Sequence, residues 1–150
     1  MNDGLDERSD EDCLYLDVFV PEVEGGRRGG REERLPVLVW IHGGGYTSGA
    51  GISGWYGPLF YISHEVVLVE VRYRLGPLGF LSLGTQDVPG NAGVRDQLAA
   101  LTWVQDNIER FGGDPHLVTV YGQSAGSFAS TYHIMSPLAR SVQTFSPHIS

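Results

Sequence analysis

The chain has 150 residues, of which 41% are hydrophobic and 11% aromatic, a composition typical of a globular protein with a single core. Its formal net charge of −8 argues against partners such as nucleic acid or an anionic membrane surface. No apolar run approaches the roughly 18 residues of a membrane span, and the acidic N-terminus shows no signal peptide.

Acidic residues dominate the start of the chain, where residues 1–34 hold eleven Asp or Glu and five Arg. The first predicted strand is Leu14–Val20, in which apolar and polar residues partly alternate. Residues 22–34 are almost entirely Gly, Arg and Glu, so we predict a mobile, solvated connector. The single cysteine, Cys13, is either a buried thiol or half of a disulfide whose partner lies elsewhere.

Three continuous apolar runs predict strands that are buried on both faces of a sheet. These runs are Leu35–Ile41, Val66–Val71 and Leu117–Tyr121. Between the second and the third, Leu75–Gly90 is punctuated by Gly and Pro and is predicted to be a loop.

The clearest predicted helix is Asn91–Phe111, where apolar residues recur every three or four positions. The apolar stripe consists of Val94, Leu98, Leu101, Val104, Ile108 and Phe111. Gly112 and Gly113 are expected to end the helix in a left-handed cap, and Ser127–Met135 can form a second helix. Helices that alternate with apolar strands predict a mostly parallel, doubly wound α/β sheet.

The segment GQSAG at 122–126 matches the pattern G-x-S-x-G between a predicted strand and a predicted helix. Such a turn holds a nucleophilic serine, here Ser124, clear of the sheet in a strained backbone conformation. Side chains two residues before and after it would collide, which explains Gly122 and Gly126. The backbone N–H of Ala125 would then point at the oxyanion that develops on a substrate.

A second motif, HGGG at 42–45, follows the apolar run that ends at Ile41. This motif supplies further backbone N–H donors to an oxyanion, and its glycines let the backbone itself approach the substrate oxygen. Each motif alone also fits a chance match or an ordinary glycine-rich turn, but the two in this order favour a serine hydrolase. His42 is expected to shape the loop, since it lies in the wrong place for the base.

The chain resembles the type-B carboxylesterases, cholinesterase-like members of the α/β-hydrolase family. The matching segments are EDCLYLDVFVP at 11–21, LPVLVWIHGGGY at 35–46, RYRLGPLGFLS at 72–82, GNAGVRDQLAALTWVQDNIERFGGDP at 90–115 and VTVYGQSAG at 118–126. This resemblance covers about residues 11–140. It implies a partial α/β-hydrolase fold and hydrolysis of small-molecule carboxylic esters through an acyl-enzyme, with no cofactor and no metal.

The resemblance also assigns the candidate site residues. It implies that Ser124 is the nucleophile and that the backbone N–H groups of Gly44, Gly45 and Ala125 form the oxyanion hole. One position departs from the family pattern, because Gln123 stands where a glutamate usually precedes the nucleophile. Loss of that carboxylate removes a negative charge beside a catalytic histidine.

Two further pairings follow from the resemblance. Arg74 and Asp96 match a structural salt bridge of the family. Cys13 matches a cysteine that bridges to one further upstream, and no cysteine precedes it here. That bridge suggests an oxidising compartment and leaves the localisation open. Tyr46 and Trp55 are expected either to line part of a pocket or to belong to the core.

A serine hydrolase also needs a base and an acid, which in this family follow the serine. No Asp or Glu follows Ser124. His133 and His148 do follow it, but structural or incidental roles are expected for both. We therefore predict that the sequence is truncated at both ends, inactive alone and poorly soluble, with an open sheet edge.

Two alternatives stay open. Neuroligin-like relatives are non-catalytic adhesion domains that generally lack the nucleophilic serine, so Ser124 favours the enzyme. The chain could instead be a gene-model or splice fragment without activity of its own, which the unmatched tail at 141–150 supports.

Overall fold

The structure is a computed structural model that describes residues 10–22, 34–51, 57–142 and 145–149, with side chains as far as residue 139. Residues 23–33 of the predicted connector and Trp55 lie outside the described residues, so the predictions for them stay untested.

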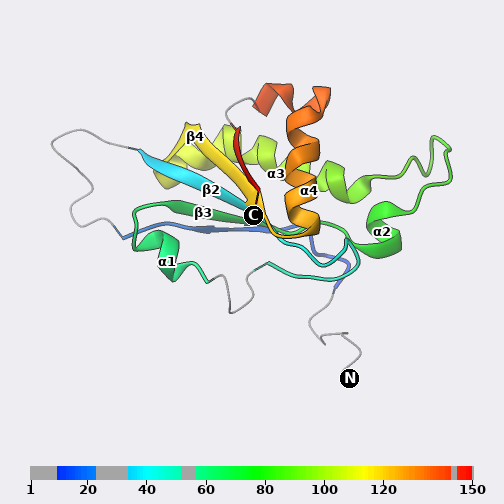
Figure 1. The fold of residues 1–150 in the computed structure, drawn as a ribbon, viewed down its shortest axis with the longest axis horizontal. Coiled ribbons are helices and arrows are strands. Elements are labelled where there is room, and N and C mark those ends of the chain that lie inside the picture. The colour runs from blue at the N-terminus through cyan, green and yellow to red at the C-terminus, as the bar shows by residue number, and fades with distance from the viewer. Residues whose placement is uncertain (1–9, 23–33, 52–56, 143–144, 150) are drawn as a thin grey trace, which may run out of the picture.

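A five-stranded mixed sheet, with the strand order β1-β3-β2-β4-β5, is the centre of the described residues (Figure 1). The strands are β1 (Leu16–Phe19), β2 (Leu35–Ile41), β3 (Val67–Val71), β4 (Gly113–Gly122) and β5 (Phe145–Ile149). Strands β3, β2, β4 and β5 are parallel, and β1 is antiparallel to β3. The prediction of a mostly parallel sheet is confirmed.

The helices are α1 (Leu59–Ile62), α2 (Gly76–Phe80), α3 (Ala92–Asn107) and α4 (Ala125–Met135), and two 3-10 helices are η1 (Ile108–Phe111) and η2 (Pro137–Val142). The long predicted helix is therefore α3 continued by η1. The cap residue Gly112 has a φ of 79°, so the predicted left-handed ending is confirmed.

Helices α1, α2 and η2 and strand β5 were not expected. Helix α2 lies inside Leu75–Gly90, so the prediction of a plain loop there is wrong. Pro77 stands in its first turn, where a fixed φ favours a helix start. Strand β5 and helix η2 occupy part of the unmatched tail, and β5 pairs with β4 from Phe145 to Ile149.

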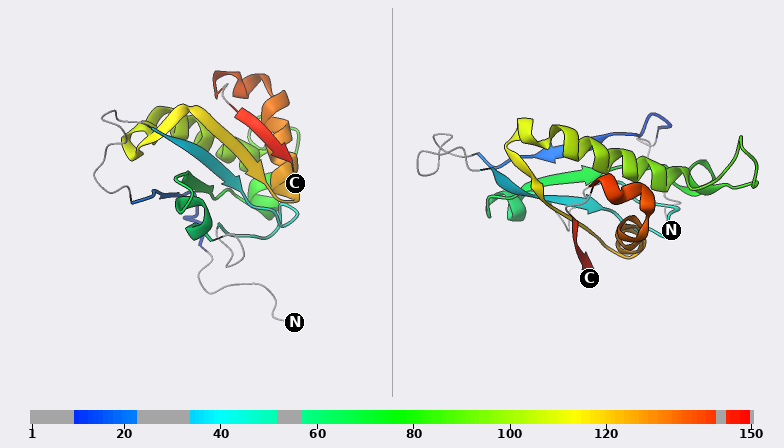
Figure 2. Two further views of the ribbon diagram at one scale, coloured as in Figure 1. Left: turned by 60° about the vertical axis from the view of Figure 1, so that its left-hand side comes forward. Right: turned by 90° about the horizontal axis from the view of Figure 1, so that it is seen from above.

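Helices α3 and α4 cover one face of the sheet, and α1 lies on the other (Figures 1 and 2). The core between the sheet and α3 is aliphatic. Helices α3 and η1 contribute Leu101, Val104 and Ile108 to it, and all three are fully buried. The last residue of the predicted stripe, Phe111, is 39% exposed because the chain has passed into the tighter η1 there.

The predicted ion pair between Arg74 and Asp96 is confirmed. The guanidinium donates to the carboxylate at 2.6 Å (Nη2–Oδ1) and 2.7 Å (Nε–Oδ2), and the backbone N–H of Arg74 donates to Oδ2 at 3.1 Å. The pair joins the segment after β3 to α3. Cys13 is half-buried with a free thiol.

Asp96→Ala is expected to lower the free energy of unfolding by about 2 kcal/mol, because it removes three hydrogen bonds to a largely buried carboxylate. Asp17→Ala is the matched control, since the Arg72–Asp17 pair is 39% exposed on both sides and should contribute less than about 1 kcal/mol. Urea unfolding measures both, and equal losses would show that Asp96 makes no special contribution.

No helix within the described residues is long and apolar enough to cross a membrane. In the same part of the chain, no group of three His, Cys, Asp or Glu side chains is arranged to hold a metal ion.

Candidate active site

Ser124 lies at the turn between β4 and α4, at the carboxyl end of the central strands. Its backbone has φ 54° and ψ −120°, and its side chain is exposed. A positive φ costs a non-glycine residue about 1–3 kcal/mol, so the surrounding contacts must hold this turn in place.

The glycines on either side of Ser124 make the turn sterically feasible. A Cβ on Gly126 would lie 2.0 Å from the carbonyl oxygen of Ile41, at the end of β2. A Cβ on Gly122 would lie 2.4 Å from the backbone carbonyl carbon of Gly126. The absence of both side chains therefore lets α4 begin directly against the end of β2.

The glycines of the HGGG segment lie against the same turn. A Cβ on Gly43 would lie 2.5 Å from the carbonyl oxygen of Gln123 and 3.2 Å from the Cβ of Ser124. Gly44 and Gly45 have φ values of 110° and 62°, which favour glycine. Because Gly43 has no side chain, the backbone of this loop runs close to the turn at Gln123 and Ser124.

The backbone N–H groups of Gly44, Gly45 and Ala125 have no acceptor among the described residues. Ala125 is the first residue of α4, so its N–H has no partner within the helix. The carbonyl of Gly44 accepts hydrogen bonds from the backbone N–H groups of Thr47 and Ser48. Because the C=O and N–H of a trans peptide point in opposite directions, the N–H of Gly45 points away from these two residues.

His42 is buried and stacks on Tyr73 with ring centroids 4.5 Å apart. Its Nδ1 lies 2.8 Å from the carbonyl oxygen of Gly43 and must carry a proton there, because a carbonyl only accepts. Burial lowers the pKa of His42 below 6.5, so the ring is neutral near pH 7. These contacts fit a residue that shapes the loop.

His133 faces α3 from α4 and is only 3% exposed. Its Nε2 lies 2.9 Å from Oε1 of Gln97, and burial lowers its pKa to about 4. This buried, hydrogen-bonded position fits the structural role expected for His133. His148 lies on β5, and its side chain is beyond the described ones.

The structure also shows two tyrosine contacts that the sequence did not reveal. The hydroxyl of Tyr46 donates to the carbonyl oxygen of Ala125 at 2.8 Å, and that of Tyr73 donates to the carbonyl oxygen of His42 at 2.8 Å. Tyr46 packs against the core and also lines a cavity of about 540 Å³ between α3 and α4. The expectation that Tyr46 belongs to the core is met. The cavity is lined by neither Ser124 nor the HGGG glycines, so the expectation that Tyr46 lines a substrate pocket stays untested.

Comparison with known proteins places the chain in one family. A family model described as the carboxylesterase family matches residues 1–150. Juvenile hormone esterase of Tribolium castaneum is 48% identical over 130 residues, which are 87% of this chain and 21% of that protein. Liver carboxylesterase B-1 of Rattus norvegicus is 45% identical over 149 residues, 95% of this chain and 26% of that protein.

Acetylcholinesterase-1 of Trittame loki is 47% identical over 131 residues, 87% of this chain and 23% of that protein. The chain thus spans about a fifth to a quarter of the length of these curated relatives. The family has the α/β-hydrolase fold, and the mixed sheet with its flanking helices is consistent with part of that fold. From its sequence match and its fold, this chain belongs to the carboxylesterase family.

Proposed function

We propose that residues 1–150 carry the nucleophile and the oxyanion hole of an enzyme that hydrolyses small-molecule carboxylic esters. The hydroxyl oxygen of Ser124 attacks the ester carbonyl carbon, and its proton passes to a general base. The tetrahedral intermediate collapses to an acyl-enzyme and releases the alcohol, which takes up that proton. Water then attacks the acyl-enzyme and releases the carboxylic acid.

The N–H groups of Gly44, Gly45 and Ala125 stabilise the negative charge that develops on the carbonyl oxygen. Three preorganised donors without internal partners beside an exposed serine are the observation that supports this proposal most directly. Because backbone donors are already fixed, they need little reorganisation when the oxyanion forms.

Neither histidine described near the site is placed to act as the general base. His42 donates to a backbone carbonyl and His133 is bonded to Gln97 on the buried side of α4, so neither contacts Ser124. We therefore propose that the 150-residue chain alone has no appreciable esterase activity.

The test is a chimera in which this chain replaces the matching segment of rat liver carboxylesterase B-1. The rat enzyme then supplies the rest of the domain. The chimera is expected to hydrolyse a p-nitrophenyl ester and to react with a fluorophosphonate probe at Ser124. Ser124→Ala is expected to abolish both reactions. Ser63→Ala, an exposed serine after α1, is expected to change neither.

Circular dichroism and thermal melting establish that each chimera is folded. A folded chimera that neither turns over the ester nor takes the probe would contradict the proposal and favour a non-catalytic interaction domain. Turnover by the 150-residue chain alone that disappears in Ser124→Ala would contradict the missing base and acid.

A further inference from the structure

We propose that Tyr46 is a positioning residue that fixes the HGGG loop against the turn at Ser124, an inference that rests on the proposed function. Its hydroxyl donates to the carbonyl oxygen of Ala125 at 2.8 Å, and the two residues are 79 positions apart in sequence. Tyr46 directly follows Gly45, and Ala125 directly follows Ser124. One hydrogen bond therefore joins the two segments that carry the three free N–H donors.

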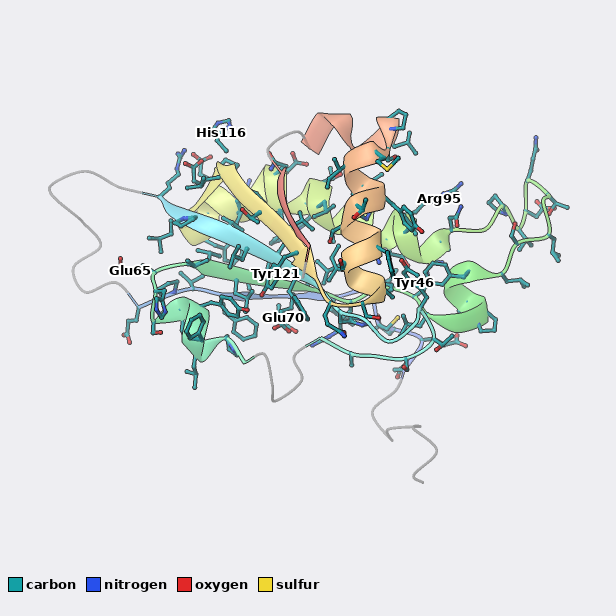
Figure 3. The ribbon with its side chains drawn as sticks, viewed as in Figure 1. Tyr46, Glu65, Glu70, Arg95, His116 and Tyr121 are labelled. Carbon is teal, nitrogen blue, oxygen red and sulfur yellow. The ribbon has the colours of Figure 1, made fainter. Side chains whose placement is uncertain are left out.

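The loop is held at both of its ends. Before the glycines, the hydroxyl of Tyr73 donates to the carbonyl oxygen of His42 at 2.8 Å. After them, the carbonyl of Tyr46 accepts the N–H of Gly76 at 2.7 Å, and the ring of Tyr46 packs against Phe80. Figure 3 shows Tyr46 beside the N-terminal end of α4.

The backbone of Tyr46 supports a positioning role. Its φ of 62° lies in the left-handed region, which a tyrosine adopts only when its surroundings hold it there. Burial raises the pKa of the Tyr46 hydroxyl above its usual value of 10, so the hydroxyl keeps its proton near neutral pH and remains a donor.

Loss of the Tyr46 hydroxyl would remove the hydrogen bond between the loop and the first residue of α4, so the glycines would be held less firmly relative to the helix. The donors of Gly44 and Gly45 come from the loop, whereas that of Ala125 comes from the helix. Their spacing matters most when the oxyanion forms and little when the substrate binds. We therefore expect an effect on kcat with little effect on KM.

The experiment is Tyr46→Phe in the full-length protein, which removes only the hydroxyl. The expected result is a kcat about 10-fold lower, with KM within about two-fold and slower labelling of Ser124 by a fluorophosphonate. Amide hydrogen exchange over residues 42–48 should become faster. Tyr132→Phe is the matched control, because Tyr132 lines the same cavity and its hydroxyl has no hydrogen-bond partner among the described residues.

The outcomes separate this inference from the proposed function. Wild-type kcat and exchange in Tyr46→Phe, or an equal loss in Tyr132→Phe, would overturn the positioning role while labelling of Ser124 still supported the esterase. If wild-type Ser124 takes no label, the proposed function fails. Hydrogen exchange then decides the inference: faster exchange in Tyr46→Phe supports it, and unchanged exchange overturns it.

A second substitution covers the case in which Tyr46→Phe does not fold. Site-specific 3,5-difluorotyrosine at position 46 keeps the ring and has a more acidic hydroxyl, which loses its proton as the pH rises past neutrality. Raising the pH then removes the hydrogen-bond donor at position 46 without a further change of sequence. Loop exchange that quickens with pH more steeply than in the wild type supports the proposal, and an unchanged pH profile overturns it.

Discussion

Replacement of Gly126 by alanine is expected to destabilise the protein by about 3 kcal/mol or more. The new Cβ would lie 2.0 Å from the carbonyl oxygen of Ile41 and 2.8 Å from that of His42. Both oxygens belong to the backbone at the end of β2, and β2 is held between β3 and β4. The strand has no room to retreat, so α4 must shift and carry the turn at Ser124 with it.

Gly57→Ala is the control for this prediction, because a Cβ there would meet no atom within 4 Å and its φ is not positive. Its expected effect is within about 0.5 kcal/mol. Urea unfolding gives both free energies, and fluorophosphonate labelling of Ser124 in the chimera follows the turn directly. A Gly126→Ala protein as stable and as reactive as Gly57→Ala would show that the contact between β2 and α4 is not essential.

The close approach at Gly126 was visible in the sequence because it follows from a local motif. Likewise, the apolar runs predicted β2, β3 and the core of β4, since a strand buried on both faces leaves a continuous pattern. Helix α2 left no such pattern, because its five residues are too few for a helical period. Strand β5 was missed because it contains Pro147, a residue that argues against a strand.

The candidate site, like the fold, was only partly predictable from the sequence. Ser124 and the three N–H donors come from short motifs, so the sequence names them. The bonds from Tyr46 to Ala125 and from Tyr73 to His42 span 79 and 31 residues, and no local pattern carries them. Such contacts depend on the strand order, which the sequence alone did not supply.

Glu70 is a further residue that the sequence analysis passed over. It is the one charged residue in the apolar run of β3, and it is only 1% exposed. It lies on the face of the sheet opposite α3 and α4 (Figure 3), paired in register with Trp40 on β2 and Asp17 on β1. Neither carboxylate oxygen has a hydrogen-bond partner among the described residues. A charge within a doubly buried strand is the signal that could have found it.

This environment makes the stability of the fold depend on pH. Burial raises the pKa of Glu70 from 4.5 to about 7, and the negative charge of Asp17 adds to this, while Arg72 partly offsets it. The folded protein therefore holds this proton more tightly than the unfolded chain. Below pH 4.5 the group is neutral in both states and costs nothing. Between pH 4.5 and 7 the Glu70 carboxyl ionises in the unfolded chain before it does so in the folded protein. The free energy of unfolding therefore falls across this range, in total by about 3 kcal/mol.

Glu70→Gln is expected to remove this loss, so the variant should exceed the wild type by about 3 kcal/mol at pH 8 and match it near pH 4. Because burial lowers the pKa of His133 to about 4, that residue contributes stability that grows between about pH 4 and 6.5. The two effects change stability in opposite directions as the pH rises. The contribution of Glu70 is therefore isolated by subtracting the wild-type free energy of unfolding from that of Glu70→Gln at each pH. Glu11→Gln, an exposed control, should leave the wild-type profile unchanged. If the difference curve for Glu70→Gln is flat from pH 4 to 8, Glu70 has a partner that satisfies its charge in the folded protein.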